Sequence, residues 1–271
     1  MKFQFIATHQ EEFPVRRTCR MLRVSASAYY AWRSRPSSLR ESQDAALLAE
    51  IRRVHERSRQ TYGSPRIQAE LRAQGQRCNH KRIERLMHQH AIRARQPRRF
   101  HRTTDSLPSL PVATNRLNRE FHADTPNQVW TADITYLDTA EGWLYLATVL
   151  DLYSRRIVGW AMAEHMETGL VREALQMALI QRHPAAGLLH HSDRGRQYAS
   201  AEYQAVLTAH GVECSMSRRG NCYDNAVHES FFGTLKSECA DGRFASRTAA
   251  RHCVFEYIEV WYNRQRRHST L

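Results

Sequence analysis

The spacing of apolar residues changes near residue 126, and this change most constrains the folds open to the chain. Upstream of it, Val15, Cys19 and Leu22 recur at the i, i+4, i+7 spacing of one helix face. Five runs rich in strand-forming residues lie downstream, at 128–138, 143–154, 156–163, 188–192 and 214–217. Helical patterns follow the third run and separate the last two. The sequence therefore predicts an all-α part followed by an α/β domain with a mixed five-stranded sheet.

Charge divides at the same place. Residues 1–125 hold 25 Lys/Arg and 11 Asp/Glu, a net of 25 − 11 = +14, whereas residues 126–271 hold 15 and 16, a net of −1. A strongly basic segment is typical of a protein that binds a polyanion, and DNA or RNA is the expected partner. The alternative is a basic surface that serves solubility alone. The sharp segregation of charge favours nucleic acid.

Motifs within the basic half predict where it would contact nucleic acid. Residues 1–40 and 41–92 each have a helix-turn-helix pattern, and residues 93–125 form an irregular basic linker. A basic helix capped by Asn79 follows a turn at Gly75, as recognition helices do. The expected DNA contacts are Lys81, Arg82 and Arg85 on that helix and Arg98 and Arg99 in the linker. For the first segment, an ordinary helical hairpin with a solvated basic face is an equally good interpretation.

Three acids in the neutral half are placed where two metal ions could be held. Asp133 lies within the first predicted strand, Asp193 follows the fourth, and Glu229 lies on a predicted helix 229 − 193 = 36 positions later. Carboxylates are ligands suited to Mg²⁺, and two such ions can clamp the attacking and leaving oxygens of a phosphodiester. This combination predicts a metal-dependent nuclease site.

Each acid taken singly has a structural explanation. Asp is common in turns, as at Asp193, and Glu is common in helices, as at Glu229. A lone carboxylate among the apolar neighbours of Asp133 would be costly without a partner or a metal. Asp151, at the end of the second strand run, is the rival acid, and we interpret it as a strand-end residue.

Longer motifs surround these acids. They are Trp130–Tyr136, His191-Ser192-Asp193-Arg194-Gly195, the segment 217–232 that contains Asp224-Asn225-Ala226 and Glu229-Ser230-Phe231-Phe232, the hexapeptide 62–67, and the closing segment 261–269. Together they resemble the OrfB-type transposases of bacterial insertion sequences, in the family named for insertion sequence three. The resemblance covers nearly the whole chain.

The resemblance implies a ribonuclease H-like catalytic core over 126–271, shared with retroviral integrases, and a D,D(35)E triad at Asp133, Asp193 and Glu229. It also implies a DNA transposase that uses two Mg²⁺ ions, for which Mn²⁺ can substitute. Such an enzyme nicks the element's ends and transfers the freed strand. Lys236, two turns after Glu229 on the same helix face, and Asn225, one turn before it, are expected to contact DNA.

The implied partners are double-stranded DNA, as terminal inverted repeats and as target, and further copies of the chain in a multimer that pairs two ends. A small helix-turn-helix protein from an upstream reading frame is a further implied partner. Two departures from the family pattern are Arg196, where a smaller residue is usual, and the end at Leu271, where relatives usually continue for several residues. The end at Leu271 is therefore compatible with a truncated element.

Two alternatives stay open at this point. One is a catalytically inactive DNA-binding regulator, and the other is a ribonuclease H-like nuclease that cuts without joining. No apolar run reaches membrane-spanning length, so we expect a cytoplasmic, nucleoid-associated protein with no membrane partner. Six scattered cysteines without a Cys-x-x-Cys pair are expected to be reduced thiols.

Overall fold

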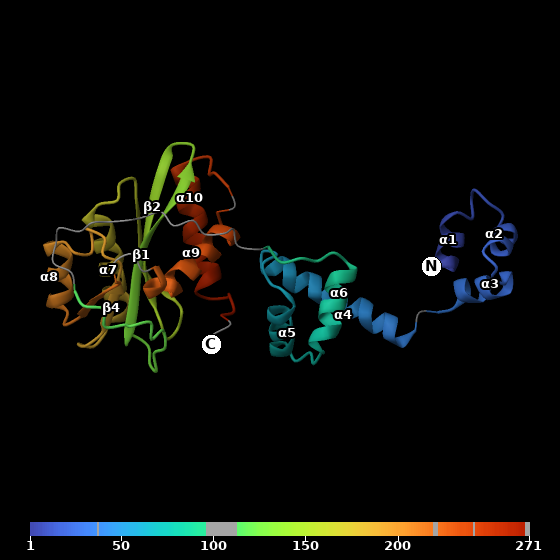
Figure 1. The fold of residues 1–271 in the computed structure, drawn as a ribbon, viewed down its shortest axis with the longest axis horizontal. Coiled ribbons are helices and arrows are strands. Elements are labelled where there is room, and N and C mark those ends of the chain that lie inside the picture. Colours follow the sequence, from blue (N-terminus) through green and yellow to red (C-terminus); the bar gives the residue numbers. More distant parts are fainter. Residues whose placement is uncertain (37, 96–112, 219–221, 241, 269–271) are drawn as a thin grey trace.

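The computed structural model describes residues 1–36, 38–95, 113–218, 222–240 and 242–268 (Figure 1). The chain begins with three short helices, α1 (Lys2–Thr8), α2 (Val15–Met21) and α3 (Ala26–Ser34). The Ser25 hydroxyl accepts a hydrogen bond from the Ala28 amide and caps α3, as its residue type predicts. Buried Ile6, Cys19 and Tyr29 form the small core that holds these helices together. The sequence pattern predicted α2 and α3 but gave no sign of α1.

A second helical unit consists of α4 (Leu39–Arg57), α5 (Ser64–Ala73) and α6 (His80–Gln89). Ser38 and Glu41 form a reciprocal capping box that fixes the start of α4. The Asn79 side chain caps α6 by accepting a hydrogen bond from the Lys81 amide at 2.9 Å. This unit has the helix-turn-helix arrangement expected from the sequence.

The α/β part is built on a sheet of strand order β3-β2-β1-β4-β5. Its strands are β1 (Val129–Thr139), β2 (Gly142–Asp151), β3 (Ile157–Ala163), β4 (Leu189–Ser192) and β5 (Glu213–Met216). The first three strands pair antiparallel as a meander, and β4 and β5 join parallel beside β1. All five lie within three residues of their predicted positions, so the mixed sheet is confirmed.

Helices cover both faces of this sheet (Figure 1). One face carries α7 (Thr168–Arg182) and α8 (Ala201–Ala209), and the other carries α9 (Ala226–Glu238) and α10 (Arg247–Phe255). A short 3₁₀ turn, η1 (Cys222–Asn225), leads into α9, and a π-helical turn, η2 (Glu256–Tyr262), continues α10. Along β1 the side chains alternate between the two layers, so odd-numbered positions such as Thr131 face the α9 side.

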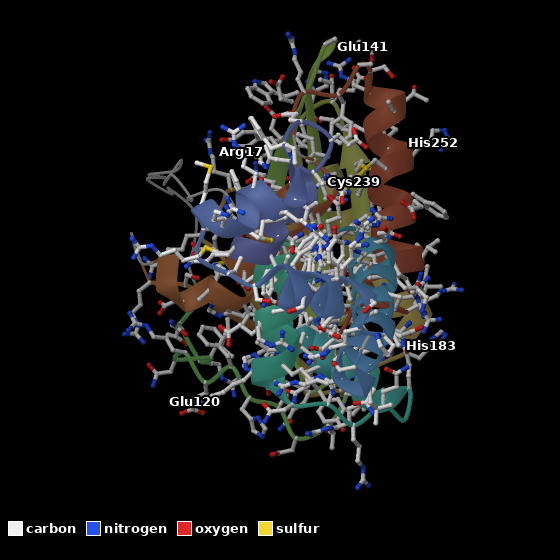
Figure 2. The ribbon with its side chains drawn as sticks, turned by 90° about the vertical axis from the view of Figure 1, so that its right-hand side faces the viewer. Arg17, Glu120, Glu141, His183, Cys239 and His252 are labelled. Atoms are coloured by element: carbon white, nitrogen blue, oxygen red, sulfur yellow. A yellow bond between two sulfur atoms is a disulfide. The ribbon has the colours of Figure 1, made fainter. Side chains whose placement is uncertain are left out.

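The tip of the β1–β2 hairpin is tied to the start of α10. Figure 2 labels Glu141 at this tip, where its carboxylate accepts a hydrogen bond from the Arg247 amide at 2.8 Å. Thr139 also forms an isolated bridge with Phe244. These links fix the hairpin relative to the helical layer that carries Glu229.

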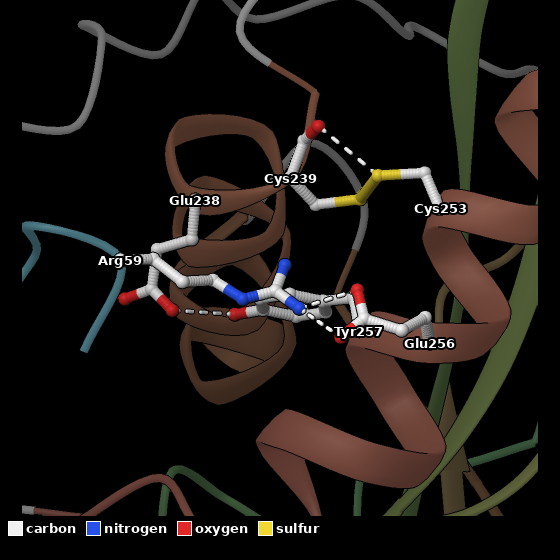
Figure 3. The surroundings of a disulfide bond; sticks show 6 residues. All are labelled: Arg59, Glu238, Cys239, Cys253, Glu256 and Tyr257. Atoms are coloured by element: carbon white, nitrogen blue, oxygen red, sulfur yellow. Dashed lines mark hydrogen bonds and ion pairs between the residues drawn. A yellow bond between two sulfur atoms is a disulfide. The ribbon is translucent and has the colours of Figure 1, made fainter. Parts of the chain in front are cut away.

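The second helical unit packs against the C-terminal segment of the α/β part. Arg59 pairs with Glu256 and lies over the ring of Tyr257, as Figure 3 shows. The same guanidinium also lies over the ring of Trp261. The Tyr62 hydroxyl accepts a hydrogen bond from the Arg267 amide at 2.7 Å. The apolar cores of the two parts are continuous through these contacts. A helix-turn-helix unit is therefore held directly against the sheet-bearing part.

Cysteine chemistry differs from the prediction at one pair. Cys239, directly after α9, and Cys253, on α10, form a disulfide with Cα atoms 6.5 Å apart (Figure 3). The expectation of reduced thiols is therefore wrong for these two residues, because the fold brings together cysteines that are 14 positions apart in the chain. Cys19, Cys78 and Cys214 are free thiols. In the described part of the chain, no helix has the length and apolar character needed to span a membrane.

Candidate active site

Strand pairing places two of the three predicted acids side by side. Thr131 of β1 is the parallel partner of His191 of β4. Two residues further along each chain are Asp133, in the middle of β1, and Asp193, just beyond the end of β4. Each aspartate is oriented by a local hydrogen bond: Asp133 accepts from the Ile134 amide at 2.8 Å and Asp193 from the Gly195 amide at 2.9 Å.

Glu229 lies in the first turn of α9 and completes the group. Burial raises the pKa of Asp133 well above its ordinary value, and the charges of Asp193 and Glu229 raise it further. Burial also raises the pKa of Asp193 and that of Glu229. The raised pKa values show that the three carboxyls do not readily ionise side by side. The group is therefore suited to a cation, because a bound cation would stabilise all three negative charges.

The helix that carries Glu229 is tied to the sheet beside Asp133. Fully buried His228 shares hydrogen bonds with the hydroxyls of Thr131, at 2.9 Å, and of Thr148, at 2.6 Å. Thr148 is the direct cross-strand partner of Asp133, so the two threonines flank this aspartate. Burial lowers the pKa of His228 to about 3, so the ring is neutral and can donate with one nitrogen while accepting with the other.

Asn225 supports the same junction. Its amide nitrogen donates to the Ala132 carbonyl at 3.3 Å, and its side chain is 5% exposed. Its Oδ1 atom is buried without a hydrogen-bond partner. The sequence predicts a DNA contact for Asn225, but in this structure its amide connects the start of α9 to β1.

Asp224, which is not among the residues predicted for the site, anchors the segment before α9. Its fully buried carboxylate accepts hydrogen bonds from the Asn115 amide group at 2.8 Å, the Arg218 backbone amide at 2.9 Å and the Arg119 guanidinium at 3.0 Å. Burial opposes its ionisation, but these bonds outweigh that effect and lower the pKa of Asp224. The Asp-Asn-Ala motif was the available signal, yet two of the three partners, Asn115 and Arg119, lie more than a hundred positions away.

Lys236 lies at the edge of the acidic group. Its ammonium is 4.7 Å from the centre of the Tyr136 ring. Burial lowers the pKa of Lys236, while the nearby charge of Asp133 raises it. The ring of Trp143 meets that of Tyr136 edge-on at 4.9 Å. A cation and two aromatic rings thus adjoin the carboxylates.

The other predicted DNA contacts are placed differently. Lys81 is exposed on α6, but Arg82 and Arg85 both bind the carboxylate of Asp44 on α4 at 2.6 Å. This pairing holds the two guanidinium groups against α4. The sequence pattern of a single helix could not predict it, because Asp44 lies on another helix. Arg98 and Arg99 lie outside the described residues.

The rival acid Asp151 has a structural environment. Its fully buried carboxylate accepts hydrogen bonds from the backbone amides of Asn127 and Ser154, both at 3.0 Å, and from the Ser154 hydroxyl. Asn127 lies in the turn before β1, and Ser154 lies in the turn after β2. The interpretation of Asp151 as a strand-end residue agrees with this geometry.

The fit of a metal ion to the three acids rests on the chemistry of the donors. Their six oxygens are hard ligands, and their mutual repulsion favours a divalent cation. Among the described residues, no three His, Cys, Asp or Glu side chains stand close enough together to enclose an ion. Mg²⁺ usually keeps several waters and takes one or two carboxylates together with substrate phosphates, so an open group of acids fits this ion.

Comparisons with known proteins find domain families that match most of the chain. Two integrase core domain families match residues 123–222 and 210–271, and an HTH-like domain family matches residues 42–100. Among solved structures, the chain resembles a simian T-cell lymphotropic virus intasome with 16% identity, 78% coverage of this chain, 69% of that chain and a TM-score of 0.44. The HTLV-2 integrase catalytic core in complex with magnesium has 15% identity over 51% of this chain and 91% of that one, with a TM-score of 0.38.

Curated relatives match over nearly the full length. Transposase InsF for insertion sequence IS3A of Escherichia coli (strain K12) is 46% identical over 99% of this chain and 94% of its own length. An uncharacterised 31 kDa protein of insertion element IS600 from Shigella sonnei is 48% identical over 93% of each chain. With an integrase core on a mixed five-stranded sheet and an HTH-like domain before it, the chain belongs to the IS3 family of transposases.

Proposed function

We propose that Asp133, Asp193 and Glu229 form the catalytic triad of a transposase that nicks the ends of its insertion sequence and joins them to target DNA. The observation that carries this proposal is the convergence of the three acids from β1, β4 and α9, with the pKa of each raised. Perturbed acids grouped in this way are typical of functional sites. The membership of the chain in a transposase family supports the same chemistry.

The triad would hold two Mg²⁺ ions, and Mn²⁺ would substitute for them. When bound, such ions activate water or a DNA 3′-hydroxyl for attack and stabilise the leaving oxygen of a phosphodiester. The protein's own contribution is to hold the carboxylates in place and to position DNA. His228 and Asn225 fix the α9 side of the site, and Lys236 would bind a phosphate beside Asp133.

Recognition of DNA would fall mainly to the basic half, with its net charge of 25 − 11 = +14 over residues 1–125. In α6, exposed Lys81 is the lead candidate for a DNA contact, and Arg82 and Arg85 would act only after release from Asp44. Arg98 and Arg99 would neutralise phosphates along the linker. Asn225 could contact DNA only by leaving its bond to Ala132.

The substrates would be the terminal inverted repeats of the element and a target duplex. A homo-multimer would pair two ends, because a single active site acts on one strand end at a time. The small helix-turn-helix protein of an upstream frame would be a further partner. The alternatives remain an inactive DNA-binding regulator and a ribonuclease H-like nuclease.

One assay separates these functions. The full chain is incubated with Mg²⁺ and a labelled duplex that carries the terminal sequence flanking its own reading frame, together with a supercoiled target plasmid. A transposase nicks the end and joins it to the plasmid, a nuclease only nicks, and a regulator only binds.

Three variants then test the site: Asp133→Asn, Asp193→Asn and Glu229→Gln. Each removes a ligand charge but little volume, so nicking and joining should be lost while DNA affinity stays within severalfold. If any variant keeps more than about a tenth of wild-type joining, roughly 1.4 kcal/mol of barrier, that residue is not a ligand.

A further inference from the structure

Two exposed aromatic side chains stand on the β1–β2 hairpin next to the proposed active site. Tyr136 is 37% exposed and Trp143 is 48% exposed, although large aromatic rings usually gain free energy from burial. Their rings meet edge-on with centres 4.9 Å apart. They project from the same face of the hairpin, because Tyr136 pairs with Tyr145, two residues after Trp143.

Lys236 connects this aromatic pair to the catalytic acids. Its ammonium lies 4.7 Å from the Tyr136 ring centre and is close enough to Asp133 for the two charges to interact. The side chains therefore run in the order carboxylate, ammonium, aromatic pair. A phosphate bound by the ammonium would place the adjoining nucleotide next to the rings.

We propose that Tyr136 and Trp143 form a stacking platform for an unpaired base of the DNA end, next to the phosphate that Lys236 binds. This inference rests on the proposed function of the site. An exposed aromatic ring offers a stacking surface to any base, whatever its sequence. A base can leave the helix and stack on protein side chains, as it does in enzymes that carry out chemistry on a base. The Lys236 ammonium beside the two rings is complementary to a nucleotide, because each nucleotide carries one negatively charged phosphate next to its base.

The base is favoured over a protein as the occupant because of what surrounds the rings. A protein docking patch is usually a wider apolar area with few charges at its centre. Here a lysine covers one ring, and beyond it lie three carboxylates. Those charges suit a phosphodiester accompanied by divalent ions.

Binding without catalysis gives the first test. The full chain is titrated, in EDTA, into a forked duplex with 2-aminopurine in its unpaired arm. Wild-type protein should quench the 2-aminopurine as the base stacks. Tyr136→Leu and Trp143→Leu should each weaken binding about 5- to 150-fold, the range expected for one lost stacking contact. Tyr136→Phe should behave like wild type, since it keeps the ring.

Tyr153→Leu is the matched control, because Tyr153 is 41% exposed in the turn after β2. It should leave both quenching and affinity unchanged. Thermal melting of each variant confirms that the fold is kept. Unchanged quenching in both platform variants would overturn the proposal, as would an effect that appeared only on self-association, which would identify the rings as a protein contact.

The second test uses Mg²⁺ and an end duplex that lacks one base at the stacked position. Wild type should nick this abasic duplex as slowly as Trp143→Leu nicks the intact one, and Trp143→Leu should lose nothing further on it. Independent, additive losses would contradict the platform. If wild type nicks neither duplex, the proposed function fails, while the titration in EDTA still decides whether the base stacks.

Discussion

Removal of the Arg266 guanidinium should destabilise the α/β part strongly. Arg266 and Glu238 are 6% and 4% exposed at their side chains, and the guanidinium donates to the carboxylate at 2.9 to 3.1 Å. The same carboxylate accepts from the Tyr257 hydroxyl at 3.0 Å and from the Trp261 indole at 3.2 Å. Arg266→Leu would leave a buried carboxylate with two neutral donors and without the guanidinium that is hydrogen-bonded to it.

Breaking a buried ion pair from one side costs about 3 to 5 kcal/mol, because the remaining charge stays buried. For a domain of this size, about 1 kcal/mol lowers the melting temperature by roughly 2 to 4 °C, so we expect a decrease of roughly 6 to 20 °C. The measurement is the thermal unfolding of the full chain, followed by calorimetry at neutral pH. The unfolding transition that moves to lower temperature should be that of the α/β part.

Two further variants make the reasoning refutable. Glu238→Gln combined with Arg266→Leu removes both charges while keeping an acceptor for Tyr257 and Trp261, so most of the lost stability should return. Arg116→Leu breaks an exposed pair with Glu213, whose side chains are 52% and 43% exposed, and should cost no more than about 1 kcal/mol. If Arg266→Leu resembles Arg116→Leu, the buried pair does not hold this segment.

Three other predictions concern stability and DNA binding. Burial and like charges raise the pKa of Asp133, so its ionisation above that raised pKa lowers the stability of the folded protein. Asp133→Asn should therefore melt at a higher temperature than wild type in EDTA at pH 8, and the difference should shrink as the pH falls. No difference at pH 8 would contradict this. Thr148→Val leaves one buried nitrogen of the neutral imidazole without a partner and should lower the free energy of unfolding by about 1 to 3 kcal/mol in urea titrations. Asp44→Asn frees Arg82 and Arg85 from their common carboxylate. The slope of log affinity for duplex DNA against log salt should then steepen by up to about 1.8, because each newly contacted phosphate adds about 0.9. An unchanged slope would mean that neither arginine reaches DNA.

The elements of the fold were predictable because local patterns specify them. Helix α7 (Thr168–Arg182) forms from the helical pattern that follows the third strand run, and all five strands match runs of strand-forming residues. Side-chain alternation along β1 also determines which residues face α9. The closeness of Asp133 and Asp193 was also predictable from those elements, because the neighbouring parallel strands β1 and β4 bring both residues to the same edge of the sheet.

Partners distant in the chain were not predictable in this way. Arg82 and Arg85 lie on the polar face of their helix, as expected, but their common partner Asp44 lies about forty positions earlier. The place of Asn225 one turn before Glu229 predicts a DNA contact, whereas the packing of α9 on β1 buries this residue. Helical periodicity identifies a face and does not identify what covers it. The disulfide between Cys239 and Cys253 was missed for the same reason.

These distant contacts concentrate on α9 and explain how one helix can hold Glu229 in register with two strands. Asp224 fixes the segment before the helix, and His228 fixes its first turn against β1 and β2. Glu238 fixes its last residue against the C-terminal segment. Because the two ends are held by independent partners, Arg266→Leu should loosen the C-terminal end of α9 and leave the bonds of His228 intact. Hydrogen exchange at the amides of α9 would then rise from Lys236 onward and stay low around Glu229, whereas a uniform rise would show that the helix is held as one cooperative unit.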